Sequence, residues 1–195
     1  GDFEETNDSV DLWIDADGQD WFDGRNQDPR RISLDESIID GNIGKKAKLS
    51  GTDDPYHNAY MSQEFGPAQT EDFSVEWDIY IEDIYNASPY RAGLSIIGEY
   101  PYISIKGPNS AGSWVFVYLA FSSYEKAPGS MDLVVRQEGD GFGEGQWTVV
   151  ASDLAIGKWY TIRLDIDLEN DAYDVYVDDA YQASVQAYRA KDRLT

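Results

Sequence analysis

The sequence contains no cysteine and a single histidine, His57. The absence of cysteine excludes disulfide bonds, thiolate metal sites and a cysteine nucleophile. With one histidine, a Ser-His-Asp triad can use His57 alone, and a zinc site built from several histidines is excluded.

Basic residues are scarce in this sequence. Lys and Arg number 15 against 37 Asp and Glu, which gives a net charge of -22 at pH 7. Such a charge repels the phosphates of nucleic acid and the headgroups of an anionic membrane, so we expect neither as a partner. The charge fits a soluble protein in a salty or calcium-rich exterior, where it is screened. A sharper interpretation is that some of the carboxylates hold calcium.

Long hydrophobic runs are missing too. No apolar run is long enough to span a membrane, and no signal peptide is visible. Hydrophobic residues nevertheless make up 42% of the chain and aromatic residues 14%, which indicates an ordered core despite the charge. A length of 195 residues suits one β-sandwich with a large core. We therefore predict a single domain over residues 1–195.

The strongest pattern lies in residues 157–179, GKWYTIRLDIDLENDAYDVYVDD. Apolar and polar residues alternate from Trp159 to Leu168, so the parity that starts at Tyr160 lies on one face of a strand. A polar turn follows, then a second alternating run from Tyr173 to Val177. The closing pair Asp178-Asp179 tolerates the positive φ of a tight turn. The stretch predicts a long antiparallel hairpin with one buried face.

Two other strong strands are predicted at residues 73–84 and 113–123. In each, one parity is apolar and faces the core, while the other carries polar or aromatic side chains. Shorter strands are predicted at residues 44–49, 56–65, 91–98, 102–106, 131–138 and 147–151. Turns rich in Gly, Pro, Asn and Asp separate them. This pattern indicates an all-β fold, a two-sheet antiparallel β-sandwich or jelly roll.

The hairpin also carries a family resemblance. Its order of Gly, Trp-Tyr, alternating strand, polar turn and Val-Tyr-Val-Asp resembles the last third of concanavalin A-like (laminin G-like) jelly rolls. The runs Gly1-Asp2-Phe3-Glu4 and Gly44–Leu49 are similar to the start of carbohydrate-binding members. This superfamily comprises lectins, carbohydrate-binding modules and glycan-cleaving enzymes, so the resemblance implies a concanavalin A-like jelly roll. In those relatives one more strand follows, and we therefore expect this domain to lack a final C-terminal strand.

Four carboxylates are candidate calcium ligands. In some of these jelly-roll families the opening Glu ligates a structural calcium, and Glu4 is the matching residue here. Asp15, Asp17 and Asp20 lie near Gly18, as the carboxylates of calcium loops do. The full spacing and the terminal bidentate Glu of an EF-hand are missing, so a plain polar turn is the alternative. We predict structural Ca²⁺ and no other cofactor.

A candidate binding face follows if the aliphatic parity of each long strand is core. The opposite parity then presents aromatic rings beside carboxylates and guanidinium groups on one concave face. Rings stack on the apolar face of a sugar, while charged groups hydrogen-bond its hydroxyls. The alternative is that Trp114, Phe116 and Tyr118 form a second layer of the core. The predicted ligand-binding residues are Glu76, Asp78, Tyr80, Arg91, Trp114, Tyr118 and Arg136.

Glu76, Asp78 and Glu82 share one parity of the 73–84 strand and form a candidate catalytic set. Residues two apart in a strand are separated by about 6.6 Å, and glycoside hydrolysis needs two closely set carboxylates. The set is similar to the catalytic strand of laminarinase-type glycosidases, in which the second Glu lies closer along the chain. A retaining geometry therefore does not follow, and a solvated polar face is the alternative.

We expect this protein to be a non-catalytic carbohydrate (polysaccharide) binding module of a secreted or cell-surface protein, located outside the cell or at its surface. Its partners would be a polysaccharide or glycan and other domains of a larger parent chain, without membrane insertion. One alternative is a glycoside hydrolase or polysaccharide lyase that uses the acidic residues of the 73–84 strand. Another is a structural or adhesive surface module with no glycan ligand.

Overall fold

A computed structural model provides the structure of the chain. The structure describes residues 3, 21–23, 31–51, 59, 61–63, 67, 69–87, 91–99, 115–137, 147–188 and 193–194. The chain divides into two compact units, Gly1–Glu64 and Phe65–Thr195. The expectation of one domain over the whole chain, lacking a final strand, stays a prediction.

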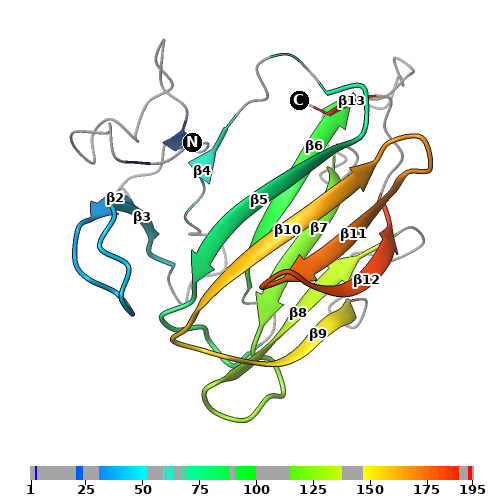
Figure 1. The fold of residues 1–195 in the computed structure, drawn as a ribbon. Helices are drawn as coiled ribbons and strands as arrows, with labels where there is room; N and C mark the ends of the chain where they lie inside the picture. Colours follow the sequence, from blue (N-terminus) through cyan, green and yellow to red (C-terminus); the bar gives the residue numbers. More distant parts are fainter. Residues whose placement is uncertain are drawn as a thin grey trace. The chain divides into compact units, whose positions relative to one another are not determined.

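The first unit holds two pairs of short antiparallel strands in its described part. β1 (Phe22–Asp23) pairs with β4 (Met61–Ser62), and β2 (Ile32–Asp35) pairs with β3 (Lys46–Leu49). The β2–β3 pair is drawn in blue to cyan in Figure 1. β3 confirms the strand predicted at residues 44–49.

A tight turn lies in the loop between β2 and β3. Ile39 and Asn42 exchange two backbone hydrogen bonds, of 2.9 and 3.2 Å, across Asp40-Gly41. Both turn residues have positive φ, 46° at Asp40 and 85° at Gly41, as a two-residue turn of type I′ requires. Asp and Gly are among the residues that accept such angles, which explains why this sequence turns here.

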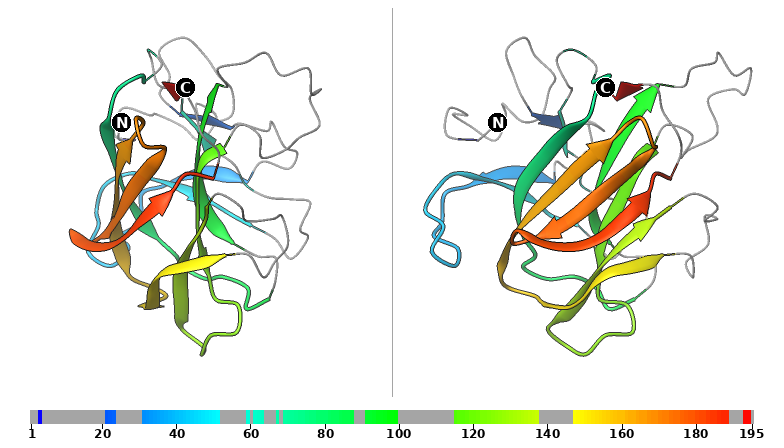
Figure 2. Two further views of the ribbon diagram at one scale, coloured as in Figure 1. Left: turned by 90° about the vertical axis from the view of Figure 1, so that its right-hand side faces the viewer. Right: turned by 45° about the vertical axis from the view of Figure 1, so that its right-hand side comes forward.

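In the described part of the second unit, nine strands form two antiparallel sheets (Figure 1). One sheet has four strands in the order β12-β11-β10-β5, and the other has five in the order β13-β6-β7-β8-β9. Figure 2 shows the two sheets as separate layers, with β10–β12 in one and β6–β8 in the other. The strands are β5 (Phe73–Tyr80), β6 (Ala92–Glu99), β7 (Val115–Ser122), β8 (Ser130–Arg136), β9 (Thr148–Ala155), β10 (Trp159–Asp167), β11 (Ala172–Val177), β12 (Ala180–Gln186) and β13 (Arg193–Leu194).

A hydrophobic core lies between these two sheets. Leu119 and Leu133 enter it from the five-stranded sheet, and Ile162 and Leu164 enter it from the four-stranded sheet, all with at most 1% of their surface exposed. Burying each such side chain stabilises the fold by about 1.5–3 kcal/mol relative to leaving it in water. The predicted all-β, two-sheet antiparallel sandwich is confirmed.

The hairpin predicted at residues 157–179 is also confirmed. β10 and β11 pair antiparallel, with Ile162 opposite Val177 and Leu164 opposite Val175, and all four side chains are buried. Asp178 and Asp179 have φ of 49° and 62° and turn the chain into β12. The alternation in the sequence therefore predicted both the antiparallel hairpin and its buried face.

Two details differ from the sequence prediction. The strand predicted at 73–84 ends at Tyr80, because β10, its partner, begins opposite that residue at Trp159. In β7, a register shift leaves Phe116 without a partner on β6, so Phe116 and Val117 both enter the core. This bulge reverses the side predicted for Phe116 from parity.

No helix occurs in the ranges that the structure describes. Accordingly, those ranges contain no helix long and apolar enough to cross a membrane.

Candidate functional site

The face of the five-stranded sheet that is turned away from the core carries an arginine beside a tyrosine. Tyr118 of β7 is the cross-strand partner of Arg136 of β8. Both have the parity opposite to that of their core neighbours Leu119 and Val135, so their side chains stand on this outer face. The Cζ atom of Arg136 lies 5.4 Å from the centroid of the Tyr118 ring, within cation–π range.

Trp147, which directly precedes β9, joins this pair. Its ring centroid lies 4.7 Å from Cζ of Arg136 and 5.1 Å from Cζ of Arg91, which directly precedes β6. The Tyr118 ring meets Trp147 edge-on at a centroid distance of 5.0 Å and meets Tyr188 at 6.2 Å. We call Arg91, Tyr118, Arg136, Trp147 and Tyr188 the arginine–aromatic cluster.

Two residues of the arginine–aromatic cluster are buried, and the other three are partly accessible to solvent. Arg136 is 5% exposed and Tyr188 fully buried, whereas Arg91, Tyr118 and Trp147 are half-buried. Each guanidinium presents five N–H donors in a planar fork, and the rings present apolar surface. This combination can stack against an apolar ring face and donate hydrogen bonds to hydroxyl or carboxylate oxygens.

The predicted ligand-binding residues do not all share one face. The structure brings Arg91, Tyr118 and Arg136 together in the arginine–aromatic cluster. The other three described members, on β5, lie on the outer face of the four-stranded sheet, across the core. Parity along a strand separates core from solvent but does not say which sheet the strand joins, which is why one concave face was expected. The three are Glu76, Asp78 and Tyr80; Trp114 lies outside the described residues.

The outer face of the four-stranded sheet has its own row of side chains. Arg163 of β10 lies opposite Glu76 of β5 on one side and Tyr176 of β11 on the other. Cζ of Arg163 stacks 4.1 Å from the Tyr176 ring centroid, and Tyr181 of β12 meets Tyr176 at 5.6 Å. Arg163 is thus flanked by a carboxylate from the chain itself.

The candidate catalytic set lies on this same face and beyond it. Glu76 and Asp78 are exposed on β5, and Asp78 accepts a 2.6 Å hydrogen bond from the Thr161 hydroxyl. Glu82 is exposed past the end of β5. All three carboxylates are exposed. Catalysis by this set thus stays an alternative prediction.

The candidate calcium ligands Glu4, Asp15, Asp17 and Asp20 lie outside the described residues. Calcium at these residues thus stays a prediction. Among the residues that the structure describes, no group of three or more His, Cys, Asp or Glu side chains is arranged to hold a metal ion.

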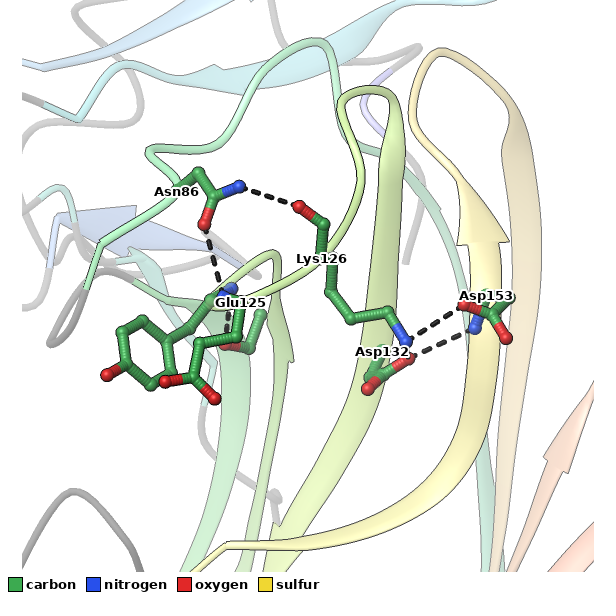
Figure 3. Close-up of polar contacts among 7 residues, drawn as sticks. Asn86, Glu125, Lys126, Asp132 and Asp153 are labelled. Atoms are coloured by element: carbon green, nitrogen blue, oxygen red, sulfur yellow. Dashed lines mark hydrogen bonds and ion pairs between the residues drawn. The ribbon is translucent and has the colours of Figure 1, made fainter.

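One compact polar network in the second unit places a lysine between two carboxylates (Figure 3). Lys126 Nζ lies 3.0 Å from Asp132 and 2.9 Å from Asp153. The Asn86 side chain donates to the Lys126 carbonyl at 2.9 Å and accepts from the Glu125 N–H at 3.2 Å. The hydrogen bonds that Lys126 donates to Asp153 and then to Asp132 raise the pKa of Lys126. The network fastens the β5–β6 loop and the β7–β8 turn to the sheet, which is a structural role.

Sequence reasoning missed Trp147 as a site residue. It lies just before β9, and the pairing of β8 with β9 contains two register shifts. Because each shift changes which residues share a face, parity gave no signal for this side chain.

No family model matches the chain, and no curated protein matches it. Among solved structures, the chain is similar to domain 4 of AbnA, a GH43 extracellular arabinanase from Geobacillus stearothermophilus, in complex with arabinotriose. The identity is 16%, the TM-score 0.49, and the match covers 99% of this chain and 78% of that one. These values are too low to transfer a ligand or a site.

Proposed function

We propose that this protein binds polysaccharide without cleaving it, through a concanavalin A-like jelly roll, and that the glycan contacts the arginine–aromatic cluster. The observation that carries the proposal is the approach of two guanidinium groups, from Arg91 and Arg136, to the Trp147 ring. The half-buried rings supply an apolar platform for a sugar, and the guanidinium groups supply hydrogen-bond donors for its oxygens.

The sheet gives this site its rigidity. Tyr118 and Arg136 stand on adjacent paired strands, and the base of the cluster is buried. Side chains held by paired strands and by packing lose little freedom when a ligand binds, so more of the contact energy appears as affinity.

The setting that we propose is extracellular or at the cell surface, in a module joined to other domains of a larger parent chain. A net charge of -22 suits a screened, salty exterior. Structural calcium held by Glu4, Asp15, Asp17 and Asp20 belongs to the same proposal.

Affinity electrophoresis through gels that contain a panel of soluble polysaccharides tests the proposal. We expect retardation by at least one polymer, and Trp147→Ala to weaken that binding by about 2 kcal/mol, roughly 30-fold. Trp159→Ala is the matched control, since Trp159 is also half-buried but lies in the four-stranded sheet, where its ring contacts Tyr80 at 5.4 Å. Retardation by no polymer, or equal loss in both variants, would contradict the proposal. Release of reducing ends by the wild type would indicate an enzyme instead.

A further inference from the structure

We infer that two copies of this chain associate through strand β12 and form a symmetric dimer, with the two β12 strands paired antiparallel. Such a dimer goes beyond carbohydrate binding and does not depend on it. The place of β12 in its sheet, its lack of charge and the symmetry of its sequence point to this contact.

β12 forms one margin of the four-stranded sheet. Its only strand partner in the described part of the chain is β11, so the sheet ends at β12 (Figure 1). Backbone groups of an edge strand that point away from its neighbour can pair with a strand of another molecule. The first residues of β12 are less suited to this, because the register shifts beside Tyr181 and the Gln182 side chain donates a 2.9 Å hydrogen bond to the Ala180 carbonyl. Residues 182–186 remain for pairing.

β12 lacks the features that keep an edge strand from pairing with another chain. Charged residues, proline or a very short strand usually give this protection. Residues 180–186, AYQASVQ, contain no charge and no proline, although 27% of the chain is charged. The other sheet margins in the described part of this unit differ: β5 carries Glu76 and Asp78, β9 carries Asp153, and β13 has only two residues. β12 is therefore the edge best suited to contact another strand.

The net charge of the chain restricts where two copies can meet. Each copy carries -22, so two copies repel unless their contact keeps carboxylates apart. Asp174 of β11 is the cross-strand partner of Ser184. In the paired dimer, Asp174 lies three strand spacings, about 14 Å, from Asp174 of the second copy. This exceeds the Debye length of about 8 Å at physiological salt, so the repulsion between these carboxylates is screened.

The sequence of the strand is symmetric about Ser184, which selects a second copy as the partner. Residues 182–186 read Gln-Ala-Ser-Val-Gln, with polar residues at the centre and at both ends. An antiparallel pair with its two-fold axis at Ser184 places this residue opposite its own copy, as an isologous contact requires. Ala183 then faces Val185 of the second copy, and both pack on the core side of the sheet. Gln182 faces Gln186, and two amide side chains can bond each other.

Sedimentation equilibrium of the full chain tests the dimer at protein concentrations from about 5 to 500 µM, since a small interface associates weakly. We expect a monomer–dimer equilibrium that shifts toward the dimer as NaCl rises from about 50 to 500 mM, because salt screens the repulsion between two acidic copies. The two-fold pair occupies β12 of both copies, so no larger species should form. A monomer at every concentration, or a dimer that dissociates as salt rises, would overturn the inference.

A lysine variant locates the contact. Ser184→Lys should weaken dimerisation by about 10-fold or more, because like charges directly opposite each other destabilise a strand pair. Ser152→Lys is the matched control, since Ser152 is exposed on β9, the margin of the other sheet, and the two variants have the same net charge. It should dimerise as the wild type does. Wild-type dimerisation by Ser184→Lys, or equal loss in both variants, would overturn pairing through β12.

A cysteine variant tests the register without adding charge. The chain has no cysteine, so Ser184→Cys introduces a single thiol at an exposed position. Directly opposite Cβ atoms in an antiparallel pair are about 4.5–5.5 Å apart, close enough for a disulfide between the two copies after small adjustment. We expect mild oxidation to convert Ser184→Cys to a covalent dimer on a non-reducing gel faster than it converts Ser152→Cys. Equal rates in the two variants would show that Ser184 does not face its own copy.

Discussion

The Cζ atom of Arg136 lies 4.7 Å from the centroid of the Trp147 ring. Arg136 is the last residue of β8, and Trp147 directly precedes β9, so the contact ties together two adjacent strands at the ends that the intervening segment connects. Arg136 is 5% exposed, and cation–π contacts strengthen as they lose water. The same contact that stabilises the sheet edge thus holds the proposed platform in place.

A double-mutant cycle measures this contact. Arg136→Met and Trp147→Leu should show a coupling free energy of about 1–2 kcal/mol in urea unfolding. Either substitution alone already removes the desolvated cation–π contact, so the double variant is less destabilised than the sum of the two single variants. Arg136→Met combined with Trp159→Leu is the control and should be additive within about 0.5 kcal/mol. Equal coupling in both cycles would mean that Arg136 acts through the sheet as a whole.

Gly93 is required by the close approach of β6 and β7. A Cβ at this position would lie 2.3 Å from the Leu119 carbonyl oxygen and 2.9 Å from the Ala120 Cα. We expect Gly93→Ala to lower the free energy of unfolding by about 2–3 kcal/mol, because backbone atoms must move to admit the methyl group. Gly51→Ala is the control, since no heavy atom lies within 4 Å of its Cβ position. A Gly93→Ala variant as stable as the wild type would contradict the pairing described for β6.

Tyr173 buries a hydroxyl group that has no hydrogen-bond partner among the described residues. The burial also raises the pKa of this side chain. Tyr173→Phe should therefore leave stability unchanged or raise it by about 1 kcal/mol, because no hydrogen bond is lost and an unsatisfied group is removed.

Tyr160→Phe is the matched control for Tyr173. The Tyr160 hydroxyl accepts from the Ala155 N–H at 2.8 Å and donates to the Ala155 carbonyl at 3.1 Å, and Tyr160 is 4% exposed. Its loss should lower the free energy of unfolding by about 1–2 kcal/mol. Chemical denaturation compares the two variants. A Tyr173→Phe variant destabilised as much as Tyr160→Phe would show that the Tyr173 hydroxyl has a partner after all.

Asp167, at the end of β10, accepts hydrogen bonds from the Asn170 side chain and backbone. These bonds, the side-chain bond first, lower the pKa of Asp167. A carboxylate whose pKa is lowered by folding stabilises the fold above its unfolded pKa of about 3.9, and this contribution is lost as the pH falls through the folded value. We expect Asn170→Ala to raise the Asp167 titration midpoint in NMR toward about 3.9.

Asp35 provides the control for that titration. Hydrogen bonds from the Ser37 hydroxyl and then its backbone N–H lower the pKa of Asp35, and Asn170 takes no part in them. The Asp35 midpoint should be the same in wild type and Asn170→Ala. An unchanged Asp167 midpoint would contradict the assignment of its pKa to Asn170.

Much of the fold was predictable because alternation is a local signal. The buried face of β10, the turn at Asp178-Asp179 and the core-facing parity of β5 can each be read from adjacent residues. The bulge at Phe116 could not be read in this way. The bulge depends on which residue of β6 lies opposite each residue of β7, and the sequence of one strand alone does not determine this pairing.

The candidate site was predictable in part for the same reason. Parity placed Arg91, Tyr118 and Arg136 away from the core, and the structure brings the three together. Parity could not show that Glu76 lies on the other sheet, because the assignment of strands to the two sheets depends on contacts between residues distant in sequence. Trp147 was missed because β9, which follows it, pairs with β8 through two register shifts, and the sequence of β9 alone does not show them.

Polysaccharide binding at the arginine–aromatic cluster can be followed through the indole N–H signals of the tryptophans. The signals of Trp147 and Trp159 are assigned by Trp147→Phe and Trp159→Phe and followed by NMR during titration with a bound oligosaccharide. We expect the Trp147 signal to shift until the protein is saturated, while the signal of Trp159, in the four-stranded sheet, stays in place. A shift of the Trp159 signal with the Trp147 signal unmoved would place the glycan on the opposite face and contradict binding at the cluster.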